Sequence, residues 1–128
     1  RPWSSAASDV YKRQDEGRAN TKELGLGRTT PVGIFTGGGS AEGLLDLSGN
    51  VFEWCSDWYA SDTYRSRADR LERNPEGADS GRYKVLRGGS AWGDKSWARC
   101  ACRYDDSPAY RSVSSGYRVA RGPLSKAP

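Results

Sequence analysis

The chain of 128 residues carries 20 Lys and Arg against 16 Asp and Glu, a net charge of +4, and contains neither His nor Met. The charges are spread without a basic run, and no apolar stretch approaches the twenty or so residues of a membrane span, so we expect no nucleic-acid partner and no membrane span. Leu, Ile, Val and Phe together supply only 17 residues, so five Trp and seven Tyr must provide much of the core of one loop-rich domain.

The N-terminal part predicts little regular structure. Residues 1–14 have no hydrophobic period and resemble translated adapter sequence, so we treat them as a non-native or adapter-like leader. The domain then occupies residues 15–122, and residues 123–128 form a disordered tail. Small polar residues alternate with Gly and Pro after the leader, which predicts an extended loop with at most a short strand at Pro31–Phe35.

The segment Gly43–Tyr59 is the densest apolar and aromatic stretch and is expected to form the heart of the domain. Its pattern predicts a short strand, a tight turn at Ser48–Asn50 and a second short strand. The charged residues 60–82, with Asn74-Pro75 and Gly77 marking turns, predict an exposed excursion between core strands.

Three further strands are predicted, at 83–92 with a break at Gly88-Gly89, at 97–104 and at 116–121, with a polar loop between the last two. Val85 and Leu86 should lie on opposite faces of their strand. Three cysteines without zinc spacing indicate neither a metal cluster nor a disulfide framework, and they do not fix the compartment.

Four motifs in order resemble the formylglycine-generating enzyme and the sulfatase-modifying factor family: LDLSGNVFEW (45–54), LRGGS (86–90), RCACR (99–103) and GYR (116–118). The resemblance covers about residues 19–122. It implies an α+β fold, an irregular, loop-rich C-type lectin-like fold of formylglycine-generating-enzyme type with short antiparallel strands. The family's domain is longer, so we expect the C-terminal part of the domain or a minimal form of it.

The same resemblance implies a structural calcium ion at the core turn. In the family pattern the ion is held by the side chains at Asp46 and Glu53 and by the main-chain carbonyls at Gly49 and Val51. A hard cation prefers such oxygen ligands. The alternative is that Asp46 caps a turn while Glu53 forms an ordinary salt bridge.

The resemblance also bears on catalysis. The family's oxidase holds copper with two cysteines between GGS and the RC-type strand, but the interval here, AWGDKSWA (91–98), has none, and Asp, Lys and Trp cannot replace soft thiolates. We therefore expect no copper and assign no catalytic residue. Cys100 and Cys102 fit small buried positions better than reactive thiols. Asp105 and Asp106 remain a weak alternative as paired carboxylates.

Because the chain keeps the family's fold motifs but lacks its catalytic groups, we expect it to bind a ligand. The variable proteins of diversity-generating retroelements use this fold and carry mutable positions between an LRGGS-like element and a GFR-like strand, here Leu86 to Arg118. Adenine-directed mutagenesis of asparagine codons never yields Lys, Glu, Gln, Met or Trp, and residues 104–115 contain none of these five. Lys95 and Trp97 belong to these five residue types, so residues 86–118 as a whole are not without them.

The predicted variable surface runs from Trp92 to Ser115, and its partner is expected to be a protein or other macromolecular ligand, with Trp92 and Tyr110 as anchors. One alternative is that these are solvated loop residues and core-packing Trp side chains. The other is that the chain is a fragment of a formylglycine-generating oxidase or sulfatase-modifying enzyme. The residues expected to form the rigid frame that carries the variable loop are Leu86, Gly88, Gly89, Arg99, Arg103 and Arg118. The candidate ligand-binding residues are Trp92, Gly93, Asp94, Tyr104, Asp105, Asp106, Ser107, Ala109, Tyr110, Ser112, Val113, Ser114 and Ser115.

Overall fold

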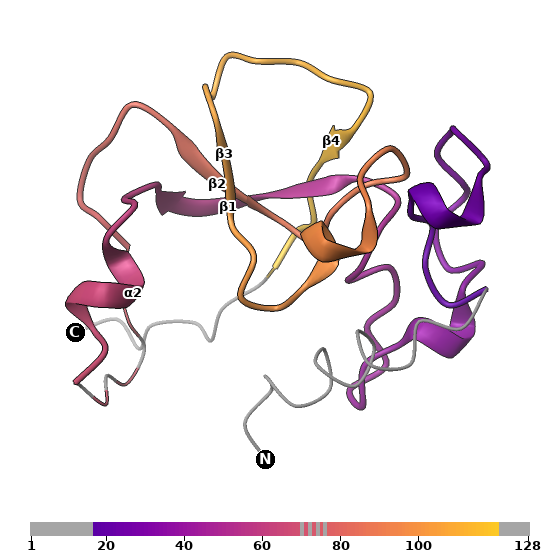
Figure 1. Ribbon diagram of the computed structural model, residues 1–128, viewed down its shortest axis with the longest axis horizontal. Helices are drawn as coiled ribbons and strands as arrows, with labels where there is room; N and C mark the ends of the chain where they lie inside the picture. The colour runs from indigo at the N-terminus through magenta and orange to yellow at the C-terminus, as the bar shows by residue number, and fades with distance from the viewer. Residues whose placement is uncertain (1–16, 70, 72, 74, 76, 121–128) are drawn as a thin grey trace, which may run out of the picture.

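A computed structural model describes residues 17–69, 71, 73, 75 and 77–120 (Figure 1). The leader at 1–14, the tail at 123–128 and most of the domain boundary lie outside these residues, so the predicted domain division stays a prediction. Within these described residues, three short 3-10 helices and one helical turn accompany four strands. In chain order these are η1 (Lys22–Leu24), η2 (Thr36–Gly38), β1 (Phe52–Trp58), α2 (Thr63–Ser66), β2 (Lys84–Arg87), η3 (Lys95–Ala98), β3 (Tyr104–Asp106) and β4 (Ser115–Gly116).

The four strands form one sheet in the order β3-β2-β1-β4. Strand β2 pairs antiparallel with both β1 and β3, as expected, while β4 pairs parallel with β1. The parallel pair is possible because a long connection separates β1 from β4 in the chain. Strand β1 carries a register irregularity between Trp54 and Trp58, which is typical of a bulge.

Each face of this sheet has its own chemistry. Trp54, Leu86 and Tyr104 are aligned across three neighbouring strands and therefore share a face. Glu53 and Arg87 are aligned on the other face. Val85 is 3% exposed and Leu86 is 1% exposed, so both faces are covered at the centre of the sheet, and the predicted opposition of these two side chains is confirmed.

Polar side chains complete a small core. The main-chain carbonyl of Asn20 accepts from Asn50 N at 2.7 Å, and the Asn50 side chain accepts from Thr30 N at 2.9 Å while its Nδ2 donates to Thr30 O at 3.1 Å. Asn20 and Asn50 are 1% and 6% exposed. The amides thus satisfy loop groups that have no sheet partner, as buried backbone requires. Phe35 is buried, whereas Trp92 and Trp97 are exposed, so the aromatic core is smaller than the composition predicted.

Several predicted strands are wrong. Residues 45–47 form irregular chain and a bend, and the strand predicted at 97–104 is replaced by η3 and a turn until Tyr104. The reason is local: Asp94 caps η3 by accepting from Ser96 N at 2.9 Å, and Cys102 N closes a turn onto Arg99 O at 2.9 Å. Of the strand predicted at 116–121, only Gly116 lies in a strand among the residues described, as the second residue of β4. Residues 31–35 form the predicted loop, without the short strand that was allowed there.

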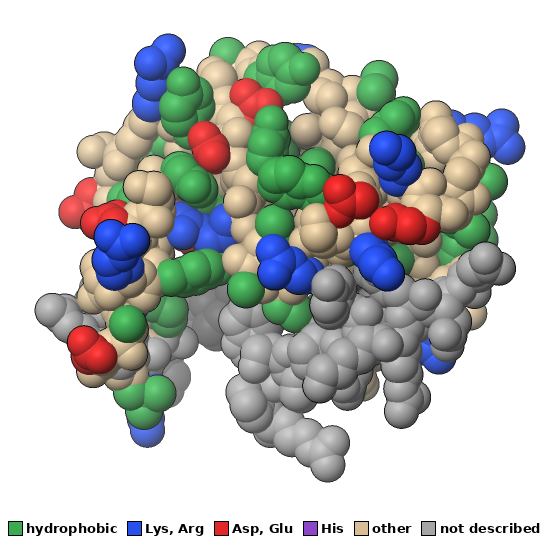
Figure 2. All heavy atoms as spheres, in the orientation of Figure 1, with side chains coloured by type: hydrophobic (Ala, Val, Ile, Leu, Met, Phe, Trp, Pro, Cys, Tyr) green, Lys and Arg blue, Asp and Glu red, His purple; other side chains and the backbone are tan. Residues whose placement is uncertain are grey.

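The predicted frame is confirmed at its glycines and arginines. Gly88 and Gly89 have φ angles of 93° and 75°, a left-handed conformation that disfavours other residues. Arg103 donates to Ala60 O at 3.2 Å and Arg118 to Leu45 O at 2.8 Å, so guanidinium groups hold carbonyls that have no strand partner. Lys and Arg alternate with Asp and Glu on the face shown in Figure 2. None of the helices described is long and apolar enough to cross a membrane.

Candidate ligand-binding surface

The connection from β3 to β4 crosses the sheet from one edge to the other, because these are its two edge strands. In Figure 1 this segment, residues 107–114, arches away from the sheet between its two fixed ends. At one end Leu86 aligns with Tyr104, and at the other Phe52 N donates to Ser114 O at 2.7 Å. The frame therefore sets where the loop begins and ends.

Short polar groups fix the loop internally. Ser107 N donates to Asp106 Oδ1 at 2.7 Å, and Tyr110 N donates to Ser107 O at 2.9 Å. The Ser112 and Ser114 hydroxyls lie 2.8 Å apart, next to a turn closed by Ser115 N. Backbone hydrogen bonds close these turns, and the short Asp and Ser side chains support them, as is common for these residues in turns. Between them Tyr110 is 51% exposed and Val113 is 79% exposed, so their side chains are offered to solvent.

Three aromatic rings form a platform beside the loop. Phe52 stacks on Tyr104 with centroids 5.3 Å apart, and Trp97 meets both rings edge-on at 6.2 and 5.6 Å. Trp97 and Tyr104 remain 37% and 40% exposed. The sequence predicted Tyr104 at the surface but missed Phe52 and Trp97. The alternation of Phe52 with the aligned Trp54 was the signal for Phe52, whereas the helical turn that places Trp97 was not foreseen.

The turn at 92–94 is attached to the N-terminal segment. Gly93 O accepts from Lys22 N at 3.0 Å, and Glu23 Oε1 accepts from Lys95 N at 2.9 Å. Burial alone would raise the pKa of Glu23, but the hydrogen bond from Lys95 N and others outweigh it and lower the pKa. The Ser96 hydroxyl and then its backbone N–H lower the pKa of Asp94. Asp94 is thus a helix cap, while Trp92, 40% exposed, faces solvent.

The fold therefore brings only some of the predicted ligand-binding residues together. Tyr104 and Ser114 meet Phe52, and Gly93 faces Trp97, since a Cβ built on Gly93 would lie 3.5 Å from Trp97 Cδ1. Asp105 and Asp106 lie in strand β3 opposite Val85 and Lys84. Successive strand residues point to opposite faces, so these two carboxylates do not form the catalytic pair that was the weak alternative. The residues placed on the exposed loop are Ser107, Ala109, Tyr110, Ser112 and Val113.

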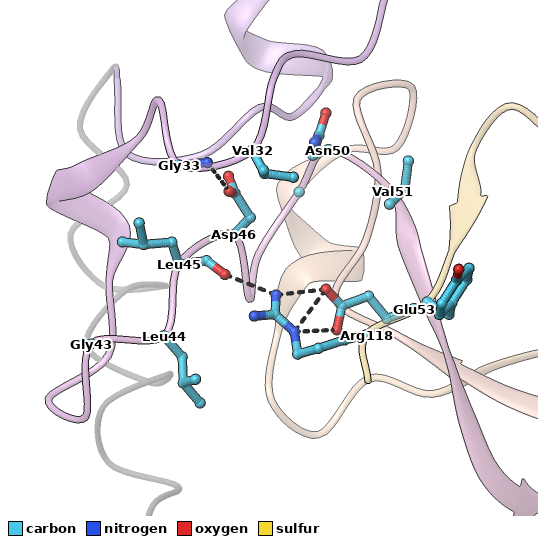
Figure 3. A pocket seen from close by; sticks show the side chains of 12 residues that line it. Val32, Gly33, Gly43, Leu44, Leu45, Asp46, Asn50, Val51, Glu53 and Arg118 are labelled. Carbon is cyan, nitrogen blue, oxygen red and sulfur yellow. Dashed lines mark hydrogen bonds and ion pairs between the residues drawn. The ribbon is translucent and has the colours of Figure 1, made fainter. Parts of the chain in front are cut away.

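A cavity of about 600 Å³ lies on another side of the molecule, and all four positions predicted to hold calcium line it (Figure 3). The turn that brings them together is unusual, because Asp46 and Asn50 have φ angles of 55° and 64° and Gly49 has 79°. Residues other than glycine rarely adopt this left-handed backbone conformation, and those that do concentrate at functional sites. The turn therefore brings the Asp46 and Glu53 segments to one cavity.

In the conformation described, both carboxylates have protein partners. Asp46 Oδ2 accepts from Gly33 N at 2.6 Å, and Arg118 Nη2 lies 2.7 Å from Glu53 Oε1. Figure 3 shows the guanidinium between the Leu45 carbonyl and the Glu53 carboxylate, with Asp46 turned toward Gly33. The hydrogen bonds to Glu53 raise the pKa of Arg118. This is the arrangement of the alternative, in which Asp46 caps a turn and Glu53 forms a salt bridge.

Comparison with known proteins decides the family. The family model described as the sulfatase-modifying factor enzyme 1-like domain matches residues 2–123. The chain belongs to this family. The formylglycine-generating enzyme of Thermomonospora curvata is 33% identical over 108 residues, which are 82% of this chain and 35% of that enzyme. The serine/threonine-protein kinase pkn1 of Chlamydia caviae is 40% identical over 94 residues, which are 73% of this chain and 15% of the kinase.

A solved structure agrees with the family and with the fold. Variable protein 1 of Treponema denticola superposes with a TM-score of 0.63 at 28% identity, over 79% of this chain and 34% of that one. The predicted C-type lectin-like fold of formylglycine-generating-enzyme type is thus confirmed. This member of the sulfatase-modifying factor family spans about a third or less of the length of these three relatives.

The donor chemistry of the cavity fits the calcium that the family resemblance implies. The lining residues Asp46 and Glu53 carry carboxylates and Gly49 and Val51 carry main-chain carbonyls, the hard oxygen ligands that calcium prefers. Asp46 and Glu53 would supply the charge, and Gly49 and Val51 the carbonyls. Because Arg118 holds both Glu53 oxygens, at 2.7 and 3.0 Å, an ion there would compete with the guanidinium for that carboxylate.

Proposed function

We propose that this chain is a non-catalytic ligand-binding module that presents the surface from Trp92 to Ser115 to a protein or other macromolecule. The loop at 107–114 carries this proposal, because it is fixed to opposite edges of one sheet and exposes Tyr110 and Val113. Tyr offers a large contact area with little rotamer entropy to lose, and Ser and Asp offer adaptable hydrogen bonds. The platform of Phe52, Trp97 and Tyr104 adds a rigid aromatic contact next to the loop.

We further propose that a retroelement diversifies this surface. Residues 104–115 contain none of the five residue types that adenine-directed change of asparagine codons cannot reach. The likeness to variable protein 1 of T. denticola supports the same proposal. Positions on an exposed loop tolerate substitution, whereas the buried Leu86 and the left-handed Gly88 and Gly89 do not, so diversification here would leave the frame intact.

The DNA around the gene tests this proposal. We expect a near-repeat of the segment that encodes Leu86 to Arg118, with differences only where the repeat carries adenine, beside a gene for a reverse transcriptase. The differing codons should fall within 92–115 and spare the codons for Gly88 and Gly89. If the locus holds neither such a repeat nor a gene for a reverse transcriptase, the proposal that a retroelement diversifies this surface is refuted.

A second candidate function is that of an oxidase, of which this chain would be one part. The 33% identity to the T. curvata formylglycine-generating enzyme favours it. Titration of the purified chain with monovalent copper separates the two, because thiolate coordination produces ultraviolet charge-transfer absorption. The interval at 91–98 has no cysteine to form the copper pair, so we expect no stoichiometric thiolate-to-copper band at neutral pH. A stoichiometric band would favour the oxidase.

We also propose that the cavity of Asp46 and Glu53 binds a structural calcium ion. Calcium should then raise the melting temperature of the wild-type chain by mass action, since an ion that binds only the folded state stabilises it. Asp46→Ala combined with Glu53→Ala should abolish this rise, while Glu42→Ala, an exposed acid outside the cavity, should retain it. The same melting temperature with calcium and with a chelator in the wild type would refute calcium binding and favour the salt bridge to Arg118.

A further inference from the structure

The sheet face opposite the aromatic platform carries a second cavity, of about 610 Å³, which shares no lining residue with the cavity of Asp46 and Glu53. Cys55 and Trp58 from β1, Val85 and Arg87 from β2 and Tyr64 from α2 contribute to its walls. The segment after η3 closes it. The cavity is therefore built from strands, a helical turn and a loop that are far apart in sequence.

Arginine dominates the charge of this cavity. Its described lining includes the guanidinium groups of Arg67, Arg87 and Arg103 and one carboxylate, that of Asp57. Three separate segments contribute them, because Arg87 belongs to β2, Arg67 follows α2 and Arg103 follows the turn at 99–101. Arg87 and Arg103 share this concave, partly apolar space with one described carboxylate, and the excess of positive charge favours an anionic guest.

Two of these guanidinium groups are positioned by the frame. Arg87 donates to Cys100 O and, at 3.4 Å, to the Tyr64 hydroxyl, and Arg103 donates to Ala60 O at 3.2 Å. Arg103 also lies over the ring of Tyr59 at 4.9 Å and over that of Tyr64 at 5.1 Å. A guanidinium carries five N–H donors in a planar fork, so each can keep these partners and still donate to a carboxylate. The groups are thereby pre-organised rather than free surface side chains.

The remaining walls are apolar. Trp58, Val85 and Ala101 line the same cavity, and Val85 is only 3% exposed. Burial is the largest effect on the Cys55 thiol and raises its pKa, and Arg87 and Arg103 both act to lower it, so the thiol senses both cations in a partly desolvated space. A guest that suits these walls has an apolar body as well as an anionic head.

We propose that this cavity is a binding site for a small carboxylate with an aromatic or aliphatic body, with Arg87 and Arg103 as the residues that hold the carboxylate. The site lies on the face of the sheet opposite Tyr104, and neither arginine belongs to the exposed loop at 107–114. Inorganic phosphate offers the charge without the body and should bind more weakly. Benzamide offers the body without the charge and should not bind.

Titration followed by nuclear magnetic resonance tests the site on the purified chain, with benzoate, inorganic phosphate and benzamide as probes. Benzoate should shift the Nε–H signals of Arg87 and Arg103 and the Trp58 indole signal. Arg87→Gln and Arg103→Gln should each weaken benzoate binding about tenfold, the cost of a lost charged hydrogen bond. Arg111→Gln is the matched control, because Arg111 donates to backbone carbonyls of the exposed loop, and it should bind benzoate as the wild type does.

Asp57→Asn keeps the test decisive even where an arginine variant fails to fold. Removing the only described carboxylate of the cavity should tighten benzoate binding about threefold and leave the Trp97 and Tyr104 signals unmoved. Unchanged or weaker binding in Asp57→Asn overturns the proposal. Equal binding of benzamide and benzoate, tighter binding of phosphate, or benzoate shifts confined to the aromatic platform would each overturn it as well.

Discussion

Replacing Leu86 by Ala removes one of the two largest side chains that are less than 2% exposed in the described part of the chain. Leu86 is aligned between Trp54 and Tyr104 on the central strand pair, so neighbouring groups cannot easily collapse into the space. Lost transfer free energy and the remaining cavity together should lower the free energy of unfolding by about 3 kcal/mol. For a domain of this size the melting temperature should fall by about 12 °C.

Val113→Ala is the matched comparison, since it also shortens an aliphatic side chain but at a position that is 79% exposed. The free energy of unfolding should change by less than about 0.5 kcal/mol. Urea unfolding followed by circular dichroism and by Trp fluorescence measures both variants, and coincident curves establish that the transition is two-state. A Val113→Ala loss comparable to that of Leu86→Ala would refute the division of this chain into a rigid frame and a tolerant loop.

Substitutions at Gly89, Gly93 and Glu23 test the backbone conformations and hydrogen bonds that hold the frame together. Gly89→Ala should destabilise the fold by about 1–2 kcal/mol in thermal melts, because φ is 75° and the added Cβ would lie 3.1 Å from Ala98 N. Gly93→Ala, whose Cβ meets Trp97 at 3.5 Å, should change stability little, and an equal loss in both would contradict the backbone explanation. The pKa of Glu23 is lower folded than unfolded, so its contribution is complete above the unfolded pKa and is lost as pH falls through the folded pKa. Glu23→Gln should therefore lower the urea midpoint slightly at pH 7 but not at pH 3, and a gap that persists at pH 3 would refute this.

The sequence predicted the fold class through its ordered motifs, and it predicted Val85 and Leu86 through strand alternation. It failed where backbone groups are satisfied locally. RCACR reads as a strand by composition, yet the Asp94 cap and the bond from Cys102 N to Arg99 O turn the chain there. The sheet begins only at Tyr104, where Leu86 offers a partner.

The candidate surface could be predicted only as a stretch of chain. Tyr110 and Val113 were within reach, because a polar loop between strands is exposed by default. Alternation with Trp54 was a signal for the face on which Phe52 lies, but its contact with Tyr104 depends on the pairing of distant strands. Trp97 was missed because the helical turn η3 replaces the predicted strand there. Arg118 was predicted as a frame residue, but its competition with calcium for Glu53 required the geometry of the cavity.

A display experiment tests the central claim, that a rigid frame carries a substitutable binding loop. One library randomises Ala109, Tyr110, Ser112 and Val113, and a matched library randomises Leu86, Gly88, Gly89 and Ser90, each measured for the fraction of displayed variants that resist protease. The loop library should keep most of its members folded and yield binders to an offered protein, whose affinity is lost when the loop reverts. A loop library as protease-sensitive as the frame library would contradict the claim.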